Sequence, residues 1–138
     1  MKYSSFDELK KDCLSCNKCN LCSTRTNIVL KAQKNALSVL KSGLSCADAD
    51  KAARGIIEDA GYGEYFGHST GHGVGVEIHE EPSLSPRSKQ TLKEGNVVTV
   101  EPGIYIPGEF GVRIEDMALI TKDGYENLTS APKELIIL

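Results

Sequence analysis

GHSTGHGVGVEIHEEP, residues 67–82, contains all three histidines of the 138-residue chain. A histidine beside glycine lies on backbone that other groups can approach closely, which suits a metal ligand or a substrate contact. The alternative is a glycine-rich turn with solvated histidines, a common surface feature. The stretch also lies where the spacing of apolar residues changes, from a helical period before it to alternation and short runs after it.

The sequence before this stretch predicts two helices. Apolar residues recur at spacings of three and four over residues 28–40, and Gly43 provides a stop. A second helix is expected from Ser45, which forms a capping box with Asp48, to Gly61. The two helices therefore form a helical hairpin.

The sequence after residue 61 predicts short strands separated by Pro, Gly and Asp turns. The expected strands are residues 74–79, 96–101, 104–106, 112–120 and 134–138. Two helices followed by antiparallel strands indicate an α+β fold.

Two carboxylates of this region are candidates for a site. Glu101 follows the apolar run 97–100, where a surface position at a strand end is the simplest interpretation. Arg113 and Glu115 lie on the same face of an otherwise apolar strand, where burying a charge is costly unless it is paired or bound to a metal. On these grounds Glu115 is a stronger candidate than Glu101. One histidine and two glutamates form a ligand set that suits Mn, Co, Fe or Zn.

Three motifs occur in order: GHxxGHGxGxxxHEEP, VxxVEPGIY and GVRIED. Together they resemble the pita-bread metallopeptidases, a family that includes methionine aminopeptidase, prolidase and the Xaa-Pro aminopeptidases. The resemblance covers residues 28–138 and is closer to the proline-directed branch, because His68 accompanies His72 and Arg113 is present. It implies the C-terminal half of a pita-bread domain, with two helices on a curved antiparallel sheet.

The resemblance implies metal ligands at His72, Glu101 and Glu115, with Glu115 bridging two ions. The expected ions are Mn or Co, with Zn as a further possibility. The implied activity is Xaa-Pro aminopeptidase-like hydrolysis of a peptide substrate, in which metal-bound water attacks the scissile carbonyl.

The resemblance also implies catalytic roles for four residues. His68 and His79 would contact the substrate carbonyl or stabilise the tetrahedral intermediate, and Arg113 would orient the bridging carboxylate. Glu101 would also transfer the proton.

The sequence departs from the family pattern before residue 28. The family takes two further ligands from aspartates on a strand hairpin, whereas residues 1–27 contain only Asp7 and Asp12, within a helix expected over residues 6–13. Cys22 occupies the position of the second aspartate, before Thr24-Arg25-Thr26. The sequence therefore predicts one bound ion or none, and a truncated, weakly active or inactive peptidase. The alternative is a non-catalytic chimeric or truncated binding module.

A cysteine quartet characterises the N-terminal arm, residues 1–27: Cys13, Cys16, Cys19 and Cys22. Residues 16–29 resemble the opening of a family-4 uracil-DNA glycosylase, which indicates a chimera joined near residue 27. Four thiolates suit Zn or an iron–sulfur cluster, but without the rest of that domain unliganded thiols are the favoured interpretation and a cluster is not expected.

Charge and hydropathy exclude further classes of function. The net charge of −3 provides no basic field for nucleic acid, and no apolar run approaches the roughly 18 residues of a membrane span. The polar start lacks the apolar core of a signal peptide, so a cytoplasmic location is expected. A half-domain exposes an apolar face, which predicts a homodimer through that face.

Overall fold

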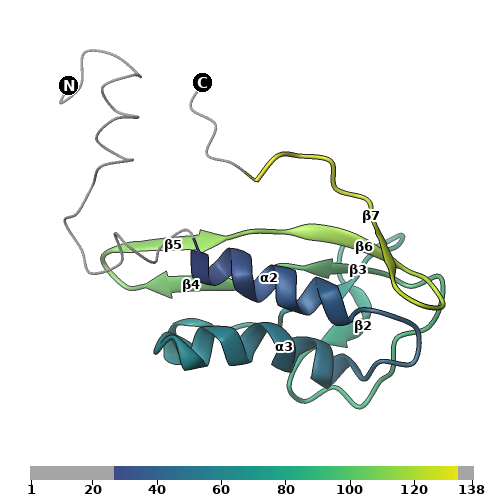
Figure 1. The fold of residues 1–138 in the computed structure, drawn as a ribbon, viewed down its shortest axis with the longest axis horizontal. Helices are drawn as coiled ribbons and strands as arrows, with labels where there is room; N and C mark the ends of the chain where they lie inside the picture. The colour runs from purple at the N-terminus through teal and green to yellow at the C-terminus, as the bar shows by residue number, and fades with distance from the viewer. Residues whose placement is uncertain (1–26, 134–138) are drawn as a thin grey trace.

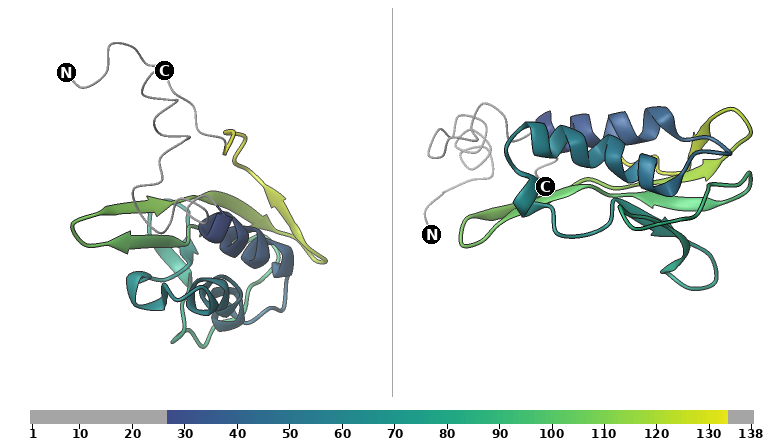
Figure 2. Two further views of the ribbon diagram at one scale, coloured as in Figure 1. Left: turned by 60° about the vertical axis from the view of Figure 1, so that its left-hand side comes forward. Right: turned by 90° about the horizontal axis from the view of Figure 1, so that it is seen from below.

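The computed structural model describes residues 27–133, which form a layer of two helices against one face of an antiparallel sheet (Figures 1 and 2). The helices are α2 (Asn27–Val39) and α3 (Cys46–Asp59), followed by the short 3₁₀ helix η2 (Gly63–Tyr65). The strands are β1 (Gly71–Gly73), β2 (Glu80–Leu84), β3 (Val97–Val100), β4 (Gly103–Ile106), β5 (Phe110–Arg113), β6 (Asp116–Ile120) and β7 (Tyr125–Asn127).

Both predicted helices are confirmed. They bury an apolar stripe against the sheet: Val29, Ala32, Ala36, Leu37 and Leu40 from α2 and its end, and Ala49, Ala53 and Ile57 from α3. Gly43 and Gly61 follow the helices with φ of 88° and 82°, a conformation that glycine adopts without a steric penalty. The predicted capping box is wrong, because the Ser45 side chain makes no cap hydrogen bond, and Ser45 instead forms a backbone bridge with Thr91.

The main sheet has five strands in the order β2-β1-β3-β6-β7, all paired antiparallel. Strands β4 and β5 form a separate hairpin that leaves the sheet after β3 and returns to it at β6 (Figure 1). The strands predicted over 96–101 and 104–106 are confirmed as β3 and β4. Strands β1, β2 and β7 were not predicted.

The strand predicted over 112–120 is wrong, because the chain forms two strands with a break between them. Val100 pairs with Asp116 on one side of the break, and Gly103 pairs with Arg113 on the other. The register is the same on both sides, so the unpaired residues 101–102 face residues 114–115. Glu101 and Glu115 are therefore opposite each other where the ladder is interrupted.

The strand predicted over 74–79 is also wrong, because these residues form a loop between β1 and β2. The loop satisfies its backbone locally: the Gly75 amide donates to the Glu77 carbonyl at 3.1 Å, and the Glu77 amide donates to the Glu80 carboxylate at 2.8 Å. Its alternating apolar side chains, Val76 and Ile78, are exposed rather than facing a core. A period of two in apolar residues therefore does not mark a strand here.

The core lies between α2 and α3 and the inner face of the sheet, where Val98, Val100, Ala118 and Ile120 are buried. Within residues 27–133, no helix is both long and apolar enough to cross a membrane. The helix predicted over 6–13, the strand predicted over 134–138 and the cysteine quartet lie outside the described residues.

Candidate functional site

His72 and Glu101 form the centre of the site. His72 is the middle residue of β1, and Glu101 directly follows β3, the neighbouring strand. The His72 Nε2 atom lies 3.0 Å from the Glu101 Oε1 atom, and the two side chains are only 16% and 11% exposed. Two residues that are 29 positions apart thus meet because β1 pairs with β3.

The hydrogen bonds of His72 determine which ring nitrogen is free. Its Nδ1 atom lies 2.9 Å from the Gly73 carbonyl oxygen, which can only accept, so Nδ1 carries the proton of the neutral ring. The Nε2 lone pair then points at a carboxylate oxygen, and two acceptors at 3.0 Å repel each other unless a proton or a cation lies between them. This is the tautomer that a histidine uses to bind a metal through Nε2.

Thr99 connects the two side chains, although the sequence did not identify it as a candidate. The His72 amide donates to Thr99 Oγ1 at 3.0 Å, and this hydroxyl donates to Glu101 Oε1 at 2.9 Å. Thr99 precedes Glu101 by two residues in an extended segment, so both side chains lie on the same side. That alternation is the sequence signal that could have found it.

Arg113 lies between the two carboxylates that face each other across the break in the ladder. Its guanidinium is 3.6 Å from Glu101 and 4.0 Å from Glu115. The preference for Glu115 over Glu101 as a buried charge is wrong, because the Glu115 side chain is 44% exposed and the Arg113 side chain 51%. The strand end, rather than the middle of a buried strand, holds the enclosed carboxylate.

The described residues contain no group of three or more His, Cys, Asp or Glu side chains arranged to hold a metal ion. His72 and Glu101 are adjacent, and the Arg113 guanidinium is within 4.0 Å of both Glu101 and Glu115. The imidazole nitrogen and carboxylate oxygen nevertheless match the donors that Mn, Co and Zn accept. The donor chemistry of the His72–Glu101 pair therefore fits a divalent cation, and Glu115 is a further carboxylate that shares Arg113 with Glu101.

His79 reaches the same site from the loop between β1 and β2. Its ring lies against that of His72, with ring centroids 4.3 Å apart and an angle of 45° between the planes. The Glu80 carboxylate holds the loop through the Glu77 amide, and it fits because Gly75 has no side chain: a Cβ there would lie 2.3 Å from Glu80 Oε2. The position of His79 thus depends on the hydrogen bond between Glu77 and Glu80, the residues on either side of it in the loop.

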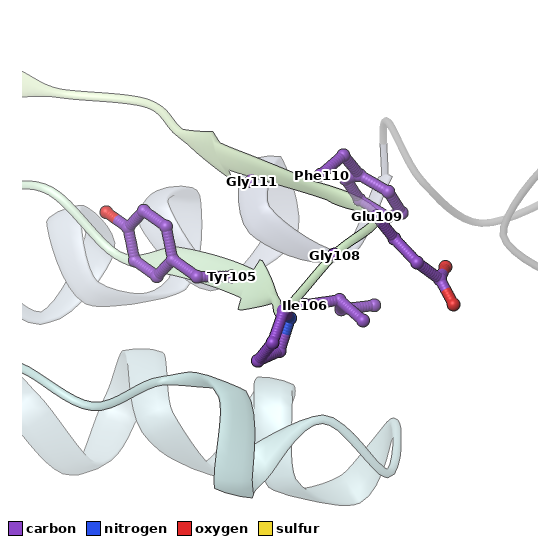
Figure 3. A pocket seen from close by; sticks show the side chains of 7 residues that line it. Tyr105, Ile106, Gly108, Glu109, Phe110 and Gly111 are labelled. Carbon is purple, nitrogen blue, oxygen red and sulfur yellow. The ribbon is translucent and has the colours of Figure 1, made fainter.

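His68 lies beside Tyr105 of β4. The His68 Nε2 atom is 3.1 Å from the Tyr105 hydroxyl, and the edge-on contact with Phe66 places the ring centroids 5.0 Å apart. Tyr105 also forms one end of a hollow of 420 Å³ at the β4–β5 hairpin (Figure 3). Carbon atoms dominate this hollow, whose lining also includes Ile106 and Phe110. Sequence reasoning missed Tyr105, which lies two residues beyond the Glu101-Pro102-Gly103 turn.

Comparison with known proteins identifies relatives over most of the chain. The model of metallopeptidase family M24 matches residues 23–122. An Xaa-Pro dipeptidase of Pyrococcus horikoshii is 55% identical over 109 residues, which are 79% of this chain and 31% of the relative. A putative dipeptidase of Bacillus subtilis, YkvY, is 54% identical over 110 residues, 80% of this chain and 30% of that protein.

Solved structures of such proteins share the fold. An Xaa-Pro dipeptidase from Bacillus anthracis has a TM-score of 0.79 and 52% identity, covering 96% of this chain and 34% of that one. A prolidase from Pyrococcus furiosus has a TM-score of 0.76 and 53% identity, covering 78% and 32% of the two chains. The predicted partial pita-bread fold is thereby confirmed. The chain spans about a third of the length of the curated relatives it matches.

Proposed function

This chain belongs to metallopeptidase family M24, and from that membership we propose that it supplies part of the active site of a metal-dependent hydrolase of Xaa-Pro peptides. The observation that carries the proposal is the approach of His72 Nε2 to Glu101 Oε1 at 3.0 Å, with Nδ1 of the same ring already bonded to a backbone carbonyl. The relatives named as Xaa-Pro dipeptidases and prolidase support the substrate class.

In this proposal His72, Glu101 and Glu115 hold a divalent cation, either Mn, Co or Zn. A bound cation of this kind lowers the pKa of a water molecule and polarises the scissile carbonyl. The hydrogen bond from Thr99 fixes the Glu101 carboxylate beside His72, and the Arg113 guanidinium holds Glu115 on the same face.

The remaining residues act on the peptide. Glu101 Oε2 is the oxygen that accepts no hydrogen bond from Thr99, and it is the atom proposed to transfer the proton. His68 and His79 are proposed to contact the substrate carbonyl. The stacking of the His79 ring on that of His72 supports this role for His79, and His68 would present its Nε2 atom, which lies beside the Tyr105 hydroxyl. Arg113 limits repulsion between the two carboxylates by lying between them.

As the chain stands, we expect weak hydrolysis or none. Residues 1–27 provide no counterpart of the two aspartates that the family resemblance requires. A non-catalytic binding module is the second candidate, and it is favoured by the lack of a three-donor cluster within residues 27–133. Binding of Zn or an iron–sulfur cluster by the cysteine quartet, Cys13, Cys16, Cys19 and Cys22, stays a prediction. Loss of bound metal in Cys16→Ser would show that the quartet binds it.

Elemental analysis tests the proposal after dialysis of the protein against Mn, Co and Zn. About one ion per chain that is lost in His72→Ala and retained in His68→Ala would support the metal site, and assays on Xaa-Pro peptides would then measure turnover. The same metal content in the wild type, His72→Ala and His68→Ala would contradict the site, and so would the absence of metal from all three. Turnover that is lacking despite His72-dependent metal would favour the binding module.

We also propose that the chain forms a homodimer through the face that the other half of a complete pita-bread domain would cover. Val76 and Ile78 are 104% and 74% exposed and lie on one loop, and Met117 of β6 is 36% exposed. A contiguous apolar patch on a protein surface favours association, and these side chains are proposed to contribute to such a patch. Light scattering at micromolar concentration should give twice the mass of the chain, and a monomer at all concentrations would refute the dimer.

A further inference from the structure

An ion pair on α3 contacts the segment that carries His68. Asp50 and Arg54 are one helical turn apart, and the guanidinium binds the carboxylate through two nitrogens, with Nε–Oδ2 at 2.7 Å and Nη2–Oδ1 at 3.0 Å. The Asp50 side chain is 1% exposed and that of Arg54 17%. Enclosing charges in this way is costly unless their remaining hydrogen bonds are satisfied.

Those remaining hydrogen bonds all go to the segment that carries His68. Arg54 Nη1 donates to the Phe66 carbonyl at 2.9 Å, and Nη2 donates to the His68 carbonyl at 2.7 Å. The guanidinium carbon also lies 4.2 Å from the centre of the Phe66 ring, a cation–π contact. The planar arginine fork can make these contacts simultaneously, whereas a lysine ammonium is a single point charge.

Asp50 holds the other end of the same segment. Its Oδ1 atom accepts hydrogen bonds from the Thr70 amide at 3.0 Å and the Thr70 hydroxyl at 2.9 Å. The Thr70 carbonyl in turn accepts the Glu101 amide at 2.7 Å. The ion pair thus binds residues 66–70 at three backbone positions, and Thr70 connects this segment to Glu101.

We propose that the Asp50–Arg54 ion pair is a positioning unit for His68, which sets where this ring lies relative to His72 and Glu101. Arg54 binds the backbone carbonyl of His68 itself, and the His68 ring packs edge-on against Phe66, whose carbonyl Arg54 also binds. The importance of this position rests on the proposed function, in which His68 contacts the substrate. The geometry itself requires no metal.

Arg54→Lys tests the proposal, with Arg87→Lys as the matched control, because Arg87 is exposed and outside the site. The readout is the NMR signals of the His68 ring protons in the metal-free protein, which are sensitive to the position of the neighbouring Phe66 ring. The signals are assigned by their loss in His68→Gln. Arg54→Lys should shift the His68 signals and leave those of His72 in place, since Asp50 can still hold Thr70. Arg87→Lys should shift neither.

A lower melting temperature with unshifted His68 signals would overturn the proposal, because Arg54 would then be only structural. Equal shifts of His68 and His72 would overturn it as well, since the effect would not be specific. If Arg54→Lys fails to fold, Asp50→Asn provides the second test: it keeps an acceptor for Thr70 while weakening the hold on Arg54, and the same His68 shift is expected.

Metal binding separates this proposal from the proposed function. Mn²⁺ titration of the chain and of Arg54→Lys should give affinities within about twofold of each other, because the hydrogen bonds of Arg54 go to Asp50, Phe66 and His68 and to none of the proposed ligands. Wild-type protein that binds no Mn²⁺ would contradict the metal site, while the shift of the metal-free His68 spectrum would still decide the role of Arg54.

Discussion

The imidazole of His72 and the carboxylate of Glu101 meet at 3.0 Å because of the register between β1 and β3. Gly73 pairs with Val98, so in the same register His72 faces Thr99 and Thr70 faces Glu101. The His72 amide accordingly donates to the Thr99 hydroxyl, which orients the Glu101 side chain toward the ring. A slip of one residue would direct these side chains to opposite faces of the sheet.

Glu101→Gln should weaken binding of Mn²⁺ by at least about tenfold, because even the loss of a group that only supports a ligand costs roughly that much. The amide has the same shape and keeps an oxygen that can accept from Thr99, so the fold should persist. Calorimetric titration measures the affinity. Glu109→Gln, on the exposed β4–β5 hairpin, is the control and should bind as the wild type does. Unchanged affinity in Glu101→Gln would remove this residue from the proposed ligands.

Gly71→Ala should destabilise the protein by about 3 kcal/mol, the upper range for overpacking a well-filled site. A Cβ at Gly71 would lie 1.8 Å from the Thr99 carbonyl oxygen, so β1 and β3 would have to separate beside His72. Urea unfolding measures the change. Gly67→Ala is the control, because nothing lies within 4 Å of its Cβ, and it should change stability by about 0.5 kcal/mol or less. Equal effects would contradict the close approach.

Lys133→Ala should lower the free energy of unfolding by about 2 kcal/mol, since it leaves the buried Asp116 carboxylate without its charged partner. Adding Asp116→Asn should recover part of the loss, because the unpaired group is then neutral. The four proteins of this double-mutant cycle give the coupling between the two side chains. Lys122→Ala, an exposed position, is the control. Strictly additive effects in the cycle would argue against the ion pair.

Cys46 predicts a loss of stability in alkaline solution. Burial raises the pKa of this thiol, against a smaller lowering by its hydrogen bond with Ser88. The folded state therefore keeps its proton at a pH where the unfolded state has lost it, so the contribution is complete below the unfolded thiol pKa of about 8.5 and is lost as the pH rises through the folded value.

The slope from this one group is at most about 1.4 kcal/mol per pH unit. Urea unfolding at pH 7, 9 and 10 measures it as the difference between wild-type protein and Cys46→Ala. The wild type should lose more stability than the variant over this interval. Parallel pH profiles for the two proteins would show that the Cys46 thiol contributes nothing to the alkaline transition.

Local patterns identified the parts of the fold whose residues interact within one element. The helical period predicted α2 and α3, and the short apolar runs predicted β3 and β4. The period of two over residues 74–79 failed because local hydrogen bonds to the Glu80 carboxylate and the Glu77 carbonyl hold that segment as a loop. Strand β2 reads EEPSL, in which only Pro82 and Leu84 are apolar, too short an alternation to predict a strand, and it pairs with β1.

The residue types of the site were visible in the sequence, whereas their environments were not. Glu115 was favoured as the buried charge, yet it is the Glu101 side chain that the neighbouring strand and Thr99 enclose. Asp50 lies on the apolar face of α3 between Ala49 and Ala53, where a carboxylate signals a buried partner. A carboxylate on the apolar face of a helix therefore predicts a buried ion pair, and sequence reasoning missed this one.

The sequence alone determined that two amphipathic helices precede short strands and that three motifs carry the histidines and carboxylates of a metallopeptidase. These properties depend on residue type and on spacing along the chain. Tertiary structure decided that His72 meets Glu101, that Arg113 approaches both Glu101 and Glu115, and that Arg54 holds the segment of His68. Strand register and the packing of α3 create these contacts between distant residues, and neither can be read from local periodicity.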